Sequence, residues 1–272
     1  MISMRGILAG VLSGVILLSP IKAQTNLNSA KVILSEMLNT YRSTSTYQDV
    51  GILRLTPQDS LASRSVESLF PRNRRARNDL SFKILFSRPQ MFRFEWQTLS
   101  DRTTLRTSVI WFDGSEGHSW SVHPAFPDGR FTFERKDSIE SLIEFSRKQT
   151  GDMVLTVPSL LMSNLGDDTF AKLITDLTDL SVLRKEIVDG EMCSLISGKV
   201  QETPWLLWVG SRTHLLRKVR SFYSIGPFDD PSQKRSFVAE EVHKNIRINK
   251  TIPSSAYQYR PRLRPGDVDL TR

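Results

Sequence analysis

Residues 81–96, SFKILFSRPQMFRFEW, contain two runs of alternating apolar residues separated by a proline. Alternation with a period of two is typical of a β-strand that turns one face toward an apolar interior. Pro89 lacks an N–H group, so a central strand cannot continue through it. The stretch therefore predicts two strands, at 81–87 and 90–98, joined by a tight turn at 88–90. One face of this pair carries six large apolar side chains: Phe82, Ile84, Phe86, Phe92, Phe94 and Trp96.

Strand patterns extend from this pair over most of the chain. Asp113-Gly114 and Asp189-Gly190 each lie between two apolar runs, which indicates tight hairpins because glycine accepts the positive φ of such turns. A third hairpin is predicted around residues 210–212, and single strands are predicted at 47–55, 130–134 and 237–248. Gly51, in the first of these strands, indicates a bulge or a close approach. The total is ten or eleven antiparallel strands.

Two segments have helical periodicity instead. After Asn28-Ser29, a suitable helix cap, apolar residues recur every three or four positions up to Tyr41, which predicts one amphipathic helix. A second helical segment, residues 137–177, interrupts the strand pattern with three short amphipathic stretches. We therefore expect an α+β, mainly β, fold: one large curved sheet, not closed into a barrel, covered by an N-terminal helix and a helical lid at 137–177.

The N-terminus has the pattern of a secretory signal. Arg5 precedes a short apolar run at residues 7–18, and Ala23 offers a small residue before a predicted cleavage point. A membrane anchor is the alternative, but this run is shorter than the roughly 20 residues that a spanning helix needs. Removal of residues 1–23 takes away two basic residues and no acidic one, so the net charge falls from +8 to +6. We expect an exported, soluble protein.

The mature chain, residues 24–272, is predicted to be one domain. Residues 56–79 form a polar, arginine-rich insertion containing Arg72, Arg74, Arg75 and Arg77. Nucleic-acid surfaces usually combine such charge with stacking aromatic residues or present it along a helix, and this insertion does neither. A solvated loop is the expected interpretation, with contact to anionic lipid head groups as the alternative. No nucleic-acid partner is expected.

The sequence offers no cofactor or metal motif and no catalytic motif. None of the four histidines has metal-ligand spacing, and one cysteine cannot complete a thiolate site. Cys193 lies on a predicted strand, where a packed core residue is the simplest interpretation and a reactive thiol the alternative. Glu95 and Glu134 could pair as acid and base, but their spacing does not favour this over solvated carboxylates. We therefore expect a protein that is not an enzyme.

The aromatic residues point instead to binding. The six apolar side chains of residues 81–96, together with Trp111 and Trp120, are predicted to share one face of the sheet. If the helices seal this face completely, the residues form only a core. If the helices cover it loosely, a cavity remains for a hydrophobic ligand. Periodicity does not choose between the two.

Several motifs resemble those of the periplasmic lipoprotein carriers, the LolA/LolB-like proteins. Residues 88–96, RPQMFRFEW, resemble the "RPxxFRW" strand of that family, and they follow a signal peptide and a helix in the family's order. The later motifs are similar to the broader group of predicted periplasmic outer-membrane lipoprotein-sorting-like proteins: Asp113, Gly114 and Trp120; Asp189, Gly190 and Cys193; Trp205, Trp208 and Lys218; Asn249, Pro253 and Tyr257.

This resemblance implies an unclosed half-barrel in the periplasm, whose helix-covered cavity receives acyl chains. The cavity would be lined by the eight residues named above, and Arg88 would hold the lid helices through their backbone carbonyls. The partners would be a lipid or an acylated protein and membrane-associated donor and acceptor proteins, with the carrier itself a monomer. The alternative is a sensor or interaction module with a filled core. The long insertion and the chain length depart from the carriers and put lipoprotein cargo in doubt.

Overall fold

The computed structural model describes residues 21–57, 79–100, 103–122, 131–136, 138–150, 156–162, 169–200, 203–225 and 235–259. Most of the predicted signal peptide and insertion, residues 1–20 and 58–78, lie outside this part. Both remain predictions. No helix in the described ranges is long and apolar enough to cross a membrane.

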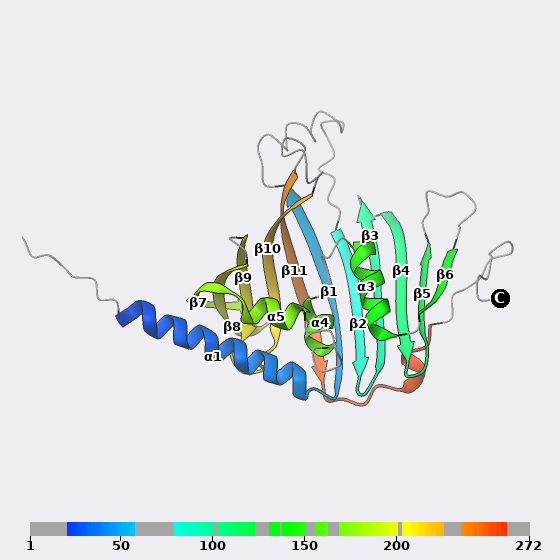
Figure 1. Ribbon diagram of the computed structural model, residues 1–272, viewed down its shortest axis with the longest axis horizontal. Coiled ribbons are helices and arrows are strands. Elements are labelled where there is room, and N and C mark those ends of the chain that lie inside the picture. Colours follow the sequence, from blue (N-terminus) through cyan, green and yellow to red (C-terminus); the bar gives the residue numbers. More distant parts are fainter. Residues whose placement is uncertain are drawn as a thin grey trace, which may run out of the picture.

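One open sheet of eleven antiparallel strands dominates the molecule (Figure 1). Its strand order is β6-β5-β4-β3-β2-β1-β11-β10-β9-β8-β7. Strands that follow one another in the chain are paired, except that β6 and β7 form the two edges, and β1 also pairs with β11. The predicted mainly β, unclosed architecture is confirmed. The strands are β1 (Thr46–Pro57), β2 (Asp79–Ser87), β3 (Met91–Ser100), β4 (Thr103–Asp113), β5 (Gly117–Val122), β6 (Phe131–Lys136), β7 (Thr178–Val188), β8 (Glu191–Val200), β9 (Thr203–Gly210), β10 (Leu216–Ile225) and β11 (Arg235–Ile248).

The tight turns lie where the glycines predicted them. Gly114 and Gly190 adopt φ values of 100° and 76°, in the region that side chains with a Cβ rarely occupy. The predicted strand pair at 81–87 and 90–98 corresponds to β2 and β3, with Phe82 opposite Trp96, Ile84 opposite Phe94 and Phe86 opposite Phe92. This register places the six apolar side chains on one face.

The helices cover that face of the sheet. They are α1 (Ile21–Ser43), α3 (Ile139–Thr150), α4 (Thr156–Met162) and α5 (Thr169–Thr175), followed near the C-terminus by a 3-10 turn, η2 (Ser254–Ala256). In Figure 1, α1 crosses the side of the sheet formed by β7 to β10. Helix α3 packs against β4, β5 and β6. The three helices predicted within residues 137–177 are confirmed. The first helix was predicted to start after Asn28-Ser29, but α1 starts at Ile21. Asn28 and Ser29 therefore lie inside the helix and do not cap it.

The core lies between the helices and the sheet. Met37 of α1, Leu142 of α3, Leu160 of α4 and Ile174 of α5 belong to the same buried cluster as the aromatic residues of β2 and β3. Each face of an antiparallel sheet can be apolar or solvated independently, so burial of the aromatic face requires these helices. We call this side the inner face and the opposite side the outer face.

Gly51 marks a close approach, as its position in β1 predicted. A Cβ built on Gly51 would lie 2.1 Å from Cζ of Phe82 and 2.5 Å from the carbonyl oxygen of Val242. Gly51→Ala is expected to lower the free energy of unfolding by about 1–3 kcal/mol, because a backbone oxygen cannot move aside. Chemical denaturation measures the change. Gly198→Ala is the control, since its Cβ would meet only leucine side chains at 3.1 to 3.3 Å. Equal losses in the two variants would contradict the explanation.

Candidate functional site

The aromatic residues of β2 and β3 form a closely packed floor beneath the helices. Their relative exposures lie between 0 and 4%. Phe94 stacks on Trp96 with 5.0 Å between ring centroids, and Phe82 lies 6.3 Å from Phe94. The prediction of an apolar inner face is therefore confirmed. We call this set the aromatic floor: Phe82, Ile84, Phe86, Phe92, Phe94 and Trp96.

Trp111 and Trp120 do not belong to the aromatic floor. Phe112 of β4 pairs with Phe92, so Trp111, one residue earlier, faces the outer side of the sheet. There Trp111 and Trp120 form a separate cluster with Val109, and both contact the ring of Tyr259. The prediction that the two tryptophans share a face with Phe92 is wrong. The run from Val109 to Phe112 is apolar at every position, so alternation could not distinguish its two faces.

Arg88, at the turn between β2 and β3, binds backbone carbonyls from two helices. Its Nε donates to the carbonyl oxygen of Thr44 at 2.9 Å, just beyond the end of α1. Its terminal nitrogen donates at 3.2 Å to the carbonyl oxygens of Tyr41 in α1 and Leu161 in α4. The last carbonyls of a helix have no partner within the helix, so one guanidinium here satisfies such groups at two helix ends. Only the bond to Leu161 reaches the predicted lid segment, residues 137–177, and the other two bonds go to the end of α1.

Partial burial destabilises the charged form of the Arg88 guanidinium. The group is only partly desolvated, and this burial lowers its pKa from the ordinary value. The guanidinium also lies over the ring of Phe86 at 5.3 Å from the ring centroid. Arg88 thus connects the aromatic floor to α1 and α4 directly.

A buried charged network crosses the seam between β1 and β11. His243 donates from Nδ1 to Oδ2 of Asp49 at 2.6 Å, and its Nε2 lies 3.1 Å from Oε1 of Glu241. Tyr47 donates to the same Asp49 oxygen at 2.9 Å. All of these side chains are almost fully buried on the inner face, where His243 also contacts the ring of Phe82. Sequence reasoning missed this network because Asp49 and His243 are 194 residues apart.

The network keeps His243 charged at neutral pH. Burial by itself opposes the imidazolium, but the hydrogen bonds and charges of Asp49 and Glu241 outweigh it and raise the pKa of His243 to about 9. The two carboxylates and one imidazolium carry a net charge of −1 in an apolar surrounding. Such a group is stable only while its partners stay together.

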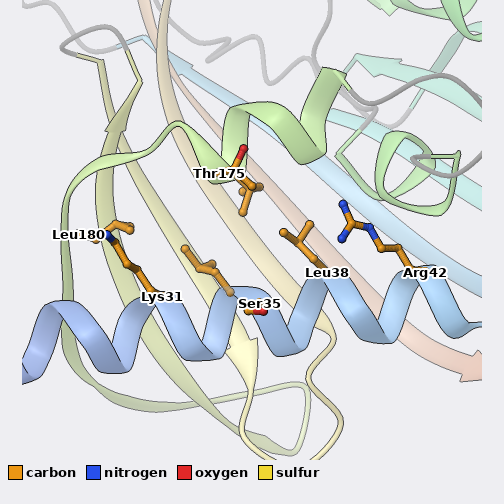
Figure 2. A pocket seen from close by; sticks show the side chains of 8 residues that line it. Lys31, Ser35, Leu38, Arg42, Thr175 and Leu180 are labelled. Carbon is orange, nitrogen blue, oxygen red and sulfur yellow. The ribbon is translucent and has the colours of Figure 1, made fainter.

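An open pocket lies at another part of the helical layer (Figure 2). It has a volume of about 400 Å³ and separates α1 from α5 and the start of β7. None of the eight predicted cavity residues lines it. Figure 2 shows Leu38 and Arg42 pointing from α1 toward α5, and Thr175 pointing back toward α1. The lining residues are Lys31, Leu34, Ser35, Leu38, Arg42, Ile174, Thr175 and Leu180.

Metal and thiol chemistry find little support in the described ranges. No cluster of three or more histidine, cysteine, aspartate or glutamate side chains there could hold a metal ion. Cys193 is fully buried against Leu195 and Trp208, and burial raises the pKa of its thiol to about 11. The interpretation of Cys193 as a packed core residue is confirmed, because a protonated, inaccessible thiol is a poor nucleophile.

No known family model and no curated protein matches this chain. Lipoprotein LppX of Mycobacterium tuberculosis is a similar structure, with 11% identity, a TM-score of 0.43, and coverage of 84% of this chain and 98% of LppX. The LolA superfamily protein NE2245 of Nitrosomonas europaea has 12% identity, a TM-score of 0.31, and coverage of 85% and 97%.

The MucA/MucB complex of Pseudomonas aeruginosa is a third similar structure. A chain of that complex has 8% identity and a TM-score of 0.42, with coverage of 85% of this chain but only 61% of the other. All three similarities have identities of at most 12% and TM-scores below 0.5, so they carry no argument about this chain.

Proposed function

We propose that this chain is an exported, non-enzymatic binding protein for a lipid or an acylated protein, acting in the periplasm after removal of residues 1–23. The acyl chains of the ligand would reach the aromatic floor when the helical layer moves. Each methylene buried there contributes about 0.8 kcal/mol. The single observation that carries the proposal is Arg88, whose one side chain binds carbonyls at the ends of two helices that cover an apolar face.

The helices over the floor depend on such contacts. α4 and α5 have seven residues each, and helices this short are not stable in isolation. Every residue of α4 is buried, so its position is set by packing and by the bond from Arg88 to Leu161. Loss of that bond would leave a carbonyl without its partner and weaken the packing of α4 in the buried cluster that contains Phe86 and Phe92. The layer is therefore the part of the fold most suited to open for a ligand.

Arg88→Leu is expected to loosen the helical layer selectively. Amide hydrogen exchange should become at least about tenfold faster in α4 than in the wild type, the effect of losing roughly 1.4 kcal/mol of local stability. Arg93→Leu is the matched control. Arg93 also donates to two backbone carbonyls, those of Ala256 and Gln258, but on the outer face. Equal acceleration of exchange in α4 by both variants would contradict the proposed role of Arg88 in holding α4 in place.

Ligand binding itself can be tested on protein purified without detergent. Native mass spectrometry and organic extraction should detect a bound acyl compound, and delipidated protein should take up a radiolabelled fatty acid. Arg88→Leu should change the rate of uptake, whereas Arg93→Leu should not. If no acyl compound co-purifies and none is taken up by either form, the carrier proposal is wrong.

A second candidate is favoured by the packing of the aromatic floor. Phe86, Phe92 and Phe94 have no exposed surface, so in this state the floor behaves as a core rather than a ligand site. A module of this kind would bind a protein partner through its surface and carry no ligand. Absence of acyl binding, together with an unchanged exchange rate of α4 at saturating fatty acid, is the result expected for that function.

A further inference from the structure

We propose that the buried network of Asp49, Glu241 and His243 is the recognition site for a protonated primary amine carried by the bound ligand. This inference rests on the proposed function: the acyl chain would lie on the aromatic floor, and the ammonium group would bind the carboxylate of Asp49. It assigns a head-group chemistry, which an apolar floor by itself does not select. We call these three residues the seam network, because they join β1 to β11.

The two carboxylate oxygens of Asp49 have different surroundings. Oδ2 accepts two hydrogen bonds, one from Nδ1 of His243 at 2.6 Å and one from the hydroxyl of Tyr47 at 2.9 Å. Oδ1 accepts no hydrogen bond within the described part of the chain, although only 1% of Asp49 is exposed. A buried carboxylate oxygen without a donor is costly, because it has lost its hydrogen bonds to water. This oxygen is therefore an acceptor that a donor on the ligand can satisfy.

The charge of the seam network also favours a cationic group. Two carboxylates and one imidazolium carry a net charge of −1 on the inner face. Arg217, whose charge acts on the neighbouring Tyr41, already forms an ion pair with Glu191. Arg88 donates to helix carbonyls rather than to either carboxylate of the network. A ligand group of charge +1 would neutralise the network, whereas an anionic group would double its buried charge.

An ammonium group suits the seam network better than a metal ion. Both ring nitrogens of His243 face carboxylates, Nδ1 that of Asp49 at 2.6 Å and Nε2 that of Glu241 at 3.1 Å. An imidazolium that donates from both nitrogens has no lone pair for a metal. Within the described ranges, these side chains do not form a cluster that could hold a metal ion. A primary ammonium supplies N–H donors and can bind through a single carboxylate oxygen.

The seam network lies directly beside the aromatic floor. In the register of β1 and β2, Asp49 is opposite Ile84 and Tyr47 is opposite Phe86. Paired strands are about 4.8 Å apart, so the carboxylate of Asp49 borders the first row of the floor. The ring of His243 contacts Phe82 of the same floor, with 5.3 Å between ring centroids. One amphiphile could therefore place its ammonium group at Asp49 and its acyl chain on the floor.

The end of α1 covers this border. The ring of Tyr41 in α1 lies 5.9 Å from the ring of Tyr47, and the hydroxyl of Tyr47 donates to Asp49. Arg88 binds the backbone carbonyl of the same Tyr41. A movement of this helix end would therefore expose the floor and the carboxylate of Asp49 together. The seam network is then accessible in the same state in which the proposed function needs the floor to be accessible.

Isothermal titration calorimetry on the delipidated full-length protein can test the head-group class. The probes are dodecylammonium, dodecyltrimethylammonium, dodecanoate and butylammonium, all below micelle-forming concentrations. We expect dodecylammonium to bind at least about tenfold more tightly than each of the others, a difference of about 1.4 kcal/mol. Dodecyltrimethylammonium has the charge but no N–H donor, dodecanoate has the opposite charge, and butylammonium lacks a long apolar chain.

Asp49→Asn tests the residue to which the head group is assigned. This variant keeps the shape of the side chain and removes its charge, so it should weaken dodecylammonium binding by at least about tenfold and leave dodecanoate binding unchanged. Glu240→Gln is the matched control. Glu240 is next to Glu241 on β11, but its side chain lies on the outer face and pairs with Lys218 and Arg220. It should leave both affinities unchanged.

The comparison of probes uses only the wild type, so it decides the head-group class even if Asp49→Asn does not fold. A dodecylammonium probe with a photoreactive diazirine next to the amine locates the site in the same protein. Cross-links on β1 or β11 support the seam network, and cross-links confined to other elements overturn it. If dodecanoate or dodecyltrimethylammonium binds as tightly as dodecylammonium, this inference fails while the proposed function stands. If no amphiphile binds the wild type, both fail.

Discussion

Replacing His243 with alanine is expected to lower the free energy of unfolding by about 3–5 kcal/mol at neutral pH. The substitution removes the cation between Asp49 and Glu241 and leaves two carboxylates buried on the inner face. Breaking a buried charge network at one member is costly because the remaining charges cannot return to water. Urea denaturation of the full chain, followed by tryptophan fluorescence, measures the loss.

The pH dependence of the same variant identifies the cause. The folded-state pKa of His243 is about 9, above the ordinary value of 6.5, so its charge stabilises the fold fully below pH 6.5. This contribution is lost as the pH rises through 9. The difference between the wild type and His243→Ala should therefore be largest near pH 6 and shrink toward pH 10. A constant difference would show that His243 acts by packing alone.

His214→Asn is the matched control for His243. His214 also contacts a carboxylate, that of Glu36 at 3.3 Å, but both side chains are more than one-third exposed. Its φ of 53° is one that asparagine tolerates. Exposed ion pairs contribute at most about 1 kcal/mol. A loss in His214→Asn as large as that in His243→Ala would contradict the role assigned to burial.

Phe92→Ala is expected to cost a further large amount, about 3–5 kcal/mol of unfolding free energy. Phe92 is fully buried in the aromatic floor, opposite Phe86 on one side and Phe112 on the other. Removal of the ring leaves a void that the helices and strands cannot fill completely. Differential scanning calorimetry should show the loss as a lower Tm.

The size of this loss also bears on function. If the floor bordered empty space in the ligand-free state, truncation of Phe92 would remove fewer contacts and cost less than about 2 kcal/mol. Ile187→Ala provides the control, because 71% of Ile187 is exposed. Its substitution should change the stability by no more than about 0.5 kcal/mol. A small loss of stability in Phe92→Ala would indicate that a preformed cavity lies next to the aromatic floor.

Local signals predicted the strands and turns well. The Asp-Gly pairs at 113–114 and 189–190 marked hairpins because tight turns need a backbone conformation that glycine accepts. Alternation in residues 81–96 predicted both the strands and the face that became the core. Gly51 marked a close approach, now seen to involve Phe82 and Val242. Each of these signals depends only on residues near one another in the chain.

Sequence patterns did not predict the structure where a strand is apolar on both faces or where contacting residues lie far apart in the sequence. Trp111 was assigned to the wrong face, because its neighbours Ile110 and Phe112 are as apolar as it is. Here the C-terminal segment covers the outer face, with Tyr259 against the tryptophan. No local sequence pattern predicts that this C-terminal segment packs against β4. The pocket between α1 and α5 was likewise not predicted, since its two walls are separated by more than 130 residues.

The sequence by itself therefore determined a mainly β chain with an apolar inner face, a helical insertion over it, and an arginine at the turn between β2 and β3. The tertiary structure alone decided that Arg88 reaches carbonyls of both α1 and α4. It also decided that β1 meets β11 and encloses the network of Asp49, His243 and Glu241. The physical reason is range: periodicity and turn preference act over a few residues, whereas burial and charge pairing depend on which distant segments fold together.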